Sequence, residues 1–136
     1  GGTVLRVPAS ARPLYHAAAA MASNYVTALM DAAVGLMAAA SGADCETSRR
    51  ALAPLARAAM ENVIEKGAEA ALTGPIERGD AGTVARHLEA LAAAPVTVRE
   101  LYRAAGLHTL DLARRKGLDA GAAQHIDEML RRGIDK

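Results

Sequence analysis

The longest apolar stretch of the chain runs from Leu14 to Ala40 and contains no proline. Alanine, leucine and methionine dominate this stretch, and all three residue types favour a helix. The pattern therefore predicts one helix over 14–40, which would be about 40 Å long at a rise of roughly 1.5 Å per residue. Because most of its circumference is apolar, we expect this helix to be buried at the centre of the fold.

One side of this predicted helix is polar. At about 100° per residue, several polar side chains fall within a stripe roughly 100° wide. They are His16, Ser23, Asn24, Thr27 and Asp31. A polar stripe on a buried helix must face other polar groups, water or a ligand. The stripe is therefore a candidate site, with the alternative that neighbouring helices satisfy its side chains.

The next part of the chain predicts a second helix and a turn. The helix is expected over 44–72, and Pro54 should kink or divide it because proline removes one backbone hydrogen bond. The segment 73–80, TGPIERGD, has the glycine and proline content of a turn. Asp80 is expected to cap a helix over 81–93.

The remainder of the chain predicts two more helices. Thr97 and Glu100 have the spacing of a capping box, which predicts that Thr97 caps a helix ending at Gly117. Asp119 is expected to cap the last helix. The pattern as a whole predicts an all-α fold of five or six helices around one long central helix.

The same pattern suggests a simple domain organisation. Residues 1–13 carry two prolines and little periodicity, so they are predicted to be a linker or domain junction. Residues 14–136 are then expected to form one helical domain, as the length of the chain favours.

Composition adds a reason to expect a homodimer. The chain of 136 residues is 51% hydrophobic but contains no phenylalanine or tryptophan. A core made largely of alanine buries little area per residue, and a second copy of the chain could thicken it. The net charge is +1, and no basic run or aromatic platform indicates a nucleic-acid partner.

The chain is not expected to cross a membrane. His16, Asn24 and Asp31 interrupt the long apolar stretch, and its many alanines contribute little insertion energy. Cys45 is the one cysteine, so no internal disulfide is possible, and no histidine or cysteine stands at metal-ligand spacing beside it. We predict no metal site, and a cytoplasmic protein is the default expectation.

The sequence contains none of the familiar phosphate-binding, zinc-protease, hydrolase or dithiol motifs. The turn at 73–80 precedes a helix N-terminus, where free N–H groups could bind an anion and Arg78 could pair with a carboxylate. The alternative is a plain turn with Asp80 as its cap. The other histidines are expected to be partly buried and structural; they are His87, His108 and His125.

Three segments are distinctive when taken together: YHAAAAMASNY (15–25), ENVIEKGAEAALTGPIERGDAGTVARHLEAL (61–91) and ELYRAAGLHTLDLA (100–113). They resemble the C-terminal helical domain of a bacterial family of Rossmann-like oxidoreductases, a domain labelled as of unknown function. That domain is similar in architecture to the C-terminal domains of 6-phosphogluconate dehydrogenase, pyrroline-5-carboxylate reductase and ketopantoate reductase. The resemblance therefore implies a 6-phosphogluconate dehydrogenase C-terminal-like fold.

The resemblance also implies a function. Family members carry an N-terminal dinucleotide-binding domain, whose pattern is absent here, and their helical domain forms a dimer that closes the substrate cleft. We therefore expect the dimerisation and substrate-binding domain of an NAD(P)-dependent oxidoreductase, with ketopantoate or a similar small 2-oxo acid as substrate. NAD or NADP would be bound mainly by the other domain, so this chain alone is expected to be inactive. The alternative is a non-catalytic helical dimerisation or interaction module.

The resemblance implies particular site residues on the long helix. Tyr15, His16 and Asn24 match its motif, with Tyr15 as a substrate contact, His16 as the catalytic proton donor and Asn24 as the catalytic orienting group. Thr27 of the polar stripe is a further candidate substrate contact. Ketopantoate reductase and 6-phosphogluconate dehydrogenase have a lysine here, followed one turn later by asparagine. In this chain His16 lies in the lysine neighbourhood and Ala20 stands in place of the asparagine.

A second group of site residues lies in the TGPIERGD turn. The residues that match the family's second motif as substrate contacts are Thr73, Gly74 and Arg78. Arg78 is expected to pair with the carboxylate of the substrate.

Overall fold

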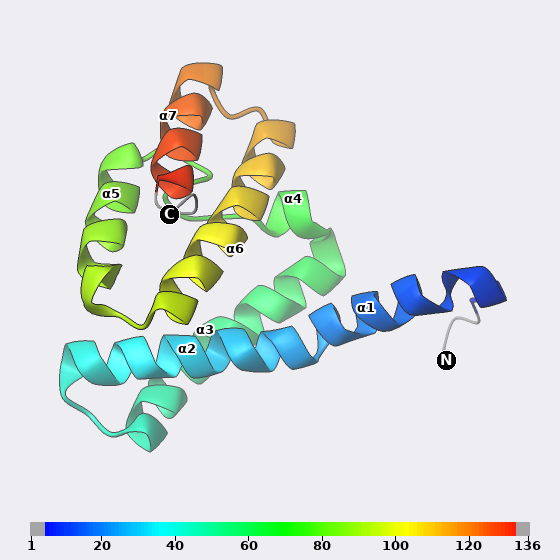
Figure 1. The fold of residues 1–136 in the computed structure, drawn as a ribbon, viewed down its shortest axis with the longest axis horizontal. Coiled ribbons are helices and arrows are strands. Elements are labelled where there is room, and N and C mark those ends of the chain that lie inside the picture. Colours follow the sequence, from blue (N-terminus) through cyan, green and yellow to red (C-terminus); the bar gives the residue numbers. More distant parts are fainter. Residues whose placement is uncertain (1–4, 133–136) are drawn as a thin grey trace. The chain divides into compact units, whose positions relative to one another are not determined.

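The computed structural model describes residues 5–132, and every regular element within them is a helix (Figure 1). The helices are η1 (Ala9–Ala11), α1 (Arg12–Ala22), α2 (Asn24–Ser41), α3 (Cys45–Lys66), α4 (Ala68–Ala71), α5 (Ala81–Ala90), η2 (Leu91–Ala93), α6 (Val96–Arg115) and α7 (Ala120–Arg131). The described part of the chain contains no strand, so the predicted all-α fold class is confirmed. Residues 1–4 of the predicted linker lie outside the described residues.

The chain divides into two compact units between Arg49 and Arg50, inside α3. Unit 1 is the chain up to Arg49 and holds α1, α2 and the start of α3. Unit 2 begins at Arg50 and holds the rest of α3 together with α4 to α7.

The predicted helix over 14–40 consists of two helices, α1 and α2, which run end to end (Figure 1). They break at Ser23, whose φ of −125° and ψ of −69° lie outside the helical region. Pro13 lies in the first turn of α1, where its missing N–H costs nothing. α2 ends at Gly42, which has a φ of 72° and donates its N–H to the carbonyl oxygen of Ala38 at 2.9 Å.

The expectation that this stretch forms the buried centre of the fold is wrong. α1 contains no buried residue, and Val34 is the one buried residue of α2. The core cluster lies in unit 2; its buried members are Ile76, Val84, Leu110, Ala113, Ala123, Ile126 and Leu130. Much of α1 and α2 is alanine, which buries little area per residue, whereas α5, α6 and α7 each carry large aliphatic side chains on one face.

The predicted helix over 44–72 is present as α3 and α4. α3 continues through Pro54, which is exposed, so the helix is not divided there. It ends before Gly67, whose φ of 79° is unfavourable for any residue with a Cβ atom. Gly67, and not Pro54, therefore decides where α3 ends.

In unit 2, α7 packs against both α5 and α6 (Figure 1). Leu110 of α6 and Leu130 of α7 are completely buried. α6 continues through Gly106, where the helices approach so closely that an added Cβ atom would lie 3.0 Å from Cδ2 of Leu130. Arg103 of α6 also secures α7, because its Nη1 donates to the carbonyl oxygens of Met129 and Leu130 at 2.9 Å each. These carbonyls belong to the last turn of α7 and have no partner within the helix.

Aspartate caps start two helices of unit 2, as the sequence predicts. Asp80 accepts the N–H of Thr83 at 2.9 Å at the start of α5. Asp119 accepts the N–H of Ala122, also at 2.9 Å, at the start of α7. Both bonds join residues three positions apart, so they need no tertiary contact to form.

The predicted capping box of α6 is wrong. The N-cap of α6 is Pro95, with no side-chain cap, and Thr97 lies inside the first turn. The carbonyl oxygen of Pro95 accepts the N–H groups of Val98 and Arg99 at 3.0 and 3.1 Å. The helix therefore begins before Thr97 can take the non-helical conformation that a cap requires.

No single helix within residues 5–132 is long and apolar enough to cross a membrane. The stretches 9–41 and 45–66 meet the criteria of length and composition only when taken together as a bent pair.

Candidate functional site

The predicted polar stripe lies on α1 and α2, and its side chains face solvent. The exposed residues are His16, Ser23, Asn24, Thr27 and Asp31. The expectation of a buried stripe is therefore wrong, because these two helices bury so little of themselves. Tyr15 is exposed beside His16, with 5.4 Å between the ring centroids. Water can satisfy these groups, so their polarity does not by itself require a ligand.

Part of the stripe lines a hollow of about 360 Å³ in unit 1. Its lining residues are Thr27, Met30, Asp31, Val34, Cys45, Glu46 and Arg49. Glu46 and Arg49, from the first turns of α3, form an ion pair. The hollow thus holds two carboxylates and one guanidinium, a balance that disfavours an anionic ligand unless Glu46 moves away from Arg49. Nothing in the sequence pattern predicts that α3 supplies this charge.

The TGPIERGD turn uses backbone N–H groups within itself. Arg78, Gly79 and Asp80 donate their N–H groups to carbonyl oxygens of the same turn, at 2.8–3.2 Å. Gly74 opens the turn with a φ of 106°, which favours glycine, and Thr73 before it is exposed. These N–H groups are not free to bind an anion. The exposed guanidinium of Arg78 is the group that remains able to pair with a carboxylate.

The predicted site residues fall in different units. Tyr15, His16, Asn24 and Thr27 belong to unit 1. Thr73, Gly74 and Arg78 belong to unit 2. Within unit 1 the structure brings Thr27 of this set to the hollow, together with Asp31 and Arg49.

Asp80 is held ionised by its own cap. Thr83 donates both its hydroxyl, at 2.7 Å, and its N–H, at 2.9 Å, to the carboxylate. These bonds, with the charges of Arg86 and Arg78 further off, lower the pKa of Asp80 from its ordinary value of 3.8. The stabilisation is fully present above pH 3.8 and is lost as the pH falls through the lower pKa of the folded state.

The substitution Asp80→Asn should therefore make the protein less sensitive to acid. Asparagine caps helices about as well as aspartate but does not titrate. We expect the melting temperature of the wild type to fall more steeply than that of the variant below pH 3.8. Circular-dichroism melts from pH 7 to about pH 2 test this, because every other carboxyl titrates alike in both proteins. If the melting temperatures of the two proteins fell in parallel as the pH is lowered, the assigned role of the cap would be contradicted.

The three other histidines are exposed, so the expectation that they are partly buried is wrong; they are His87, His108 and His125. Each lies beside the buried face of its helix and not on it. Nδ1 of His87 is 3.0 Å from the hydroxyl of Tyr102, and burial raises the pKa of that phenol. Nothing in the sequence pattern predicts this pair. Among residues 5–132, no three histidine, cysteine, aspartate or glutamate side chains are placed to hold a metal ion.

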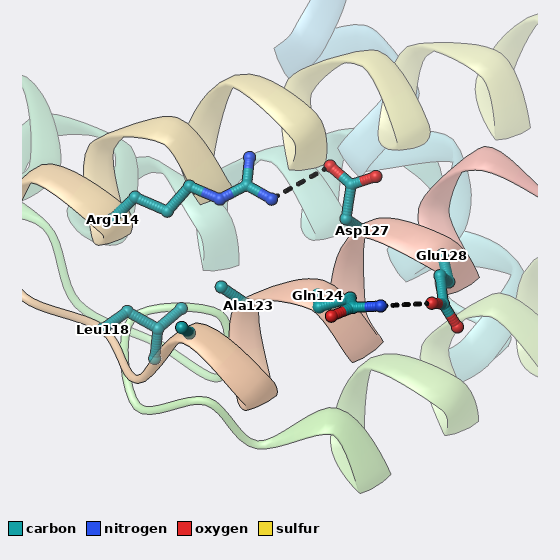
Figure 2. Close-up of a pocket in the computed structure, with 7 residues that line it drawn as sticks. Arg114, Leu118, Ala123, Gln124, Asp127 and Glu128 are labelled. Carbon is teal, nitrogen blue, oxygen red and sulfur yellow. Dashed lines mark hydrogen bonds and ion pairs between the residues drawn. The ribbon is translucent and has the colours of Figure 1, made fainter.

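A larger hollow, of about 520 Å³, lies along α6 and α7 in unit 2. Figure 2 shows that its polar side chains bond to one another: Arg114 to Asp127 at 3.2 Å and Gln124 to Glu128 at 3.1 Å. Asp127 also accepts from Arg131, and chiefly this hydrogen bond lowers its pKa. The ion pair between Arg114 and Asp127 therefore joins α6 to α7, while the bond between Gln124 and Glu128 lies within α7.

Comparison with known families finds one match over most of the chain. The model of a family described as a domain of unknown function (DUF2520) matches residues 1–109, a range that covers all of unit 1 and extends into α6. Searches of curated proteins and of solved structures found no significant match.

Proposed function

We propose, from the premise that this chain belongs to the DUF2520 family, that it is the dimerisation and substrate-binding domain of an NAD(P)-dependent oxidoreductase. The oxidoreductase part of this proposal is supported by the resemblance of residues 15–25, 61–91 and 100–113 to Rossmann-associated helical domains. The dimerisation part is supported by the large apolar side chains that α1 and α2 expose to solvent, and this exposure is the observation that carries the proposal.

Large apolar side chains of α1 and α2 lie in solvent. They are Leu14, Tyr15, Met21, Tyr25, Leu29 and Leu36. At about 100° per residue, Tyr25, Leu29 and Leu36 share one face of α2. We call these three residues the apolar face of α2. Monomeric proteins rarely expose contiguous apolar surface of this kind, and tyrosine and methionine are enriched in protein interfaces.

A second copy of the chain suits this face because the helices carry almost no charge. Between Arg12 and Ser41 the formally charged residues are Arg12 and Asp31. A two-fold interface brings the same surface of two copies together, so charges near the axis would meet like charges. The apolar face of α2 avoids that repulsion.

The substitution Tyr25→Glu should abolish the dimer. Tyr25 is 58% exposed in the single chain and occupies the middle of the apolar stretch, and a central tyrosine typically contributes about 2 kcal/mol or more to an interface. Sedimentation of the wild type should give about twice the 14.0 kDa of one chain, and that of the variant a single chain mass.

Val96→Glu is the matched control, because Val96 is 53% exposed, belongs to α6 in unit 2 and is not one of the residues of the apolar face of α2. This variant should sediment like the wild type. A wild type that sediments as one chain at micromolar concentration would remove dimerisation from the proposal.

The substrate would meet the exposed polar stripe in this proposal. His16 would give a proton to the carbonyl oxygen of a small 2-oxo acid such as ketopantoate, and Asn24 would orient that carbonyl. Arg78 of unit 2, with its exposed guanidinium, is the residue that the resemblance assigns to pairing with a carboxylate. Support for these roles comes from the resemblance and from the exposure of the side chains, which leaves them accessible.

The described residues of this chain do not fit a dinucleotide by themselves. They include no glycine-rich phosphate loop, and the backbone N–H groups of Arg78, Gly79 and Asp80 are already used within the turn. We therefore assign NAD or NADP to a separate dinucleotide-binding domain.

The test of the activity uses the full-length protein. Oxidation of NADPH and of NADH is followed with a panel of 2-oxo acids that includes ketopantoate, and turnover with at least one of them is expected. Residues 1–136 alone should show none. Absence of turnover with every acid, in a protein that still dimerises, would favour a second candidate function.

That second candidate is a non-catalytic helical dimerisation or interaction module. One observation favours it: within residues 5–132, His16 has a ring contact with Tyr15 but no hydrogen bond that would orient it as an acid. The module would still need the apolar face of α2. Sedimentation and turnover together therefore distinguish the two candidates.

A further inference from the structure

The junction between α1 and α2 is irregular at one residue. Ser23 has φ −125° and ψ −69°, which neither a helix nor a strand contains. Its N–H lies 3.4 Å from the carbonyl oxygen of Ala20. This is a long hydrogen bond, and its spacing of three residues is that of a 3-10 helix and not of an α-helix. The regular ladder of backbone hydrogen bonds is therefore weakened at this point.

Side chains partly replace the weakened ladder. Oγ of Ser23 lies 2.8 Å from the carbonyl oxygen of Ala19 and 3.2 Å from Oδ1 of Asn24, so its one proton is shared between two acceptors. The hydroxyl of Thr27 donates to the carbonyl oxygen of Ser23 at 3.3 Å. Serine and threonine hydroxyls that bond to the backbone in this way compete with the helix and bend it.

A hydroxyl bond to the preceding turn is not sufficient to break a helix in this protein. Thr109 donates to the carbonyl oxygen of Ala105 at 2.8 Å, and α6 continues through it. Two things differ at Ser23: the neighbouring Asn24 offers a second acceptor, and α1 contains no buried residue.

α1 has no buried side chain to hold its direction. A helix of 11 residues is only marginally stable alone in water. We propose that Ser23 is a hinge at which α1 moves relative to α2. Such a movement changes the distance between His16 on one side of the hinge and Asp31 on the other. The inference concerns the chain itself and stands apart from the proposed oxidoreductase activity.

Pulsed electron-spin resonance tests the hinge with two spin labels. One label is on the native Cys45, and the other is on Ala18→Cys, an exposed position of α1. We expect a broad distribution of distances in the wild-type background and a distribution roughly half as wide with Ser23→Ala, because alanine restores a continuous helix. Ser23→Gly should broaden it further. Labelled protein is diluted with unlabelled protein, so that distances between copies do not contribute.

Two controls make the outcome decisive. A label at Ala28→Cys, on the α2 side of the hinge, should give a narrow distribution with Cys45 in every background. Thr109→Ala removes a similar hydroxyl bond from α6 and should leave the Ala18–Cys45 distribution unchanged. Equal widths for the Ala18 and Ala28 labels, or no response to either substitution at Ser23, would overturn the proposal.

Discussion

Replacing Leu130 with alanine is expected to lower the free energy of unfolding by about 2–5 kcal/mol. Leu130 is completely buried where α7 crosses α6, and it belongs to a core with few large side chains. Removal leaves a cavity that the neighbouring helices cannot fill without moving, and the lost transfer energy adds to the loss of packing. Urea unfolding followed by circular dichroism measures the change.

The same site allows a test of the close approach at Gly106. An added Cβ atom there would lie 3.0 and 3.2 Å from the two Cδ atoms of Leu130, so Gly106→Ala should destabilise the wild type by overpacking. In the Leu130→Ala background that contact is gone. There Gly106→Ala should raise the free energy of unfolding by about 1 kcal/mol, because alanine has a better helix propensity than glycine. The sign of the effect should therefore reverse between the two backgrounds.

Leu55→Ala is the control for both changes. Leu55 is 70% exposed on α3, and an exposed substitution of this kind typically changes stability by less than about 0.5 kcal/mol. An equal effect of Gly106→Ala in both backgrounds would mean that Leu130 and Gly106 are not coupled through this contact.

The second large effect concerns the proposed activity. His16→Ala in the full-length protein is expected to lower kcat/KM by about 100- to 10,000-fold, the usual contribution of a positioned general acid. His16 is exposed, so its loss should leave the melting temperature unchanged and separate a chemical role from a structural one.

His125→Ala provides the matched control for His16→Ala. His125 is likewise an exposed helical histidine, on α7 in unit 2, and its replacement should leave the rate unchanged. Equal rates for the wild type and His16→Ala would remove His16 from the mechanism while leaving the dimerisation proposal untouched.

Features that depend on neighbouring residues were predictable from the sequence. Asp80 and Asp119 cap their helices through bonds that span three residues. The all-α fold class follows from the same local preferences. For the candidate site, the sequence located the polar residues along the chain, and the structure brings only Thr27 and Asp31 of the stripe to the hollow in unit 1.

Features that depend on distant residues were not predictable. The mostly apolar circumference of the helix expected over 14–40 predicts burial, but burial requires something to cover the helix, and the described chain leaves most of it in solvent. Gly106 looks like a weak point in a helix until Leu130 is found against it. Glu46 and Arg49 of α3 bring charge to the hollow, and likewise only the tertiary structure shows that they lie there.

The sequence by itself thus determined where α5 and α7 begin, because their caps are local hydrogen bonds. Only the tertiary structure decided which helices form the core and which polar residues share a hollow. The physical reason is that packing and burial depend on surfaces brought together from separate parts of the chain, which no local pattern encodes.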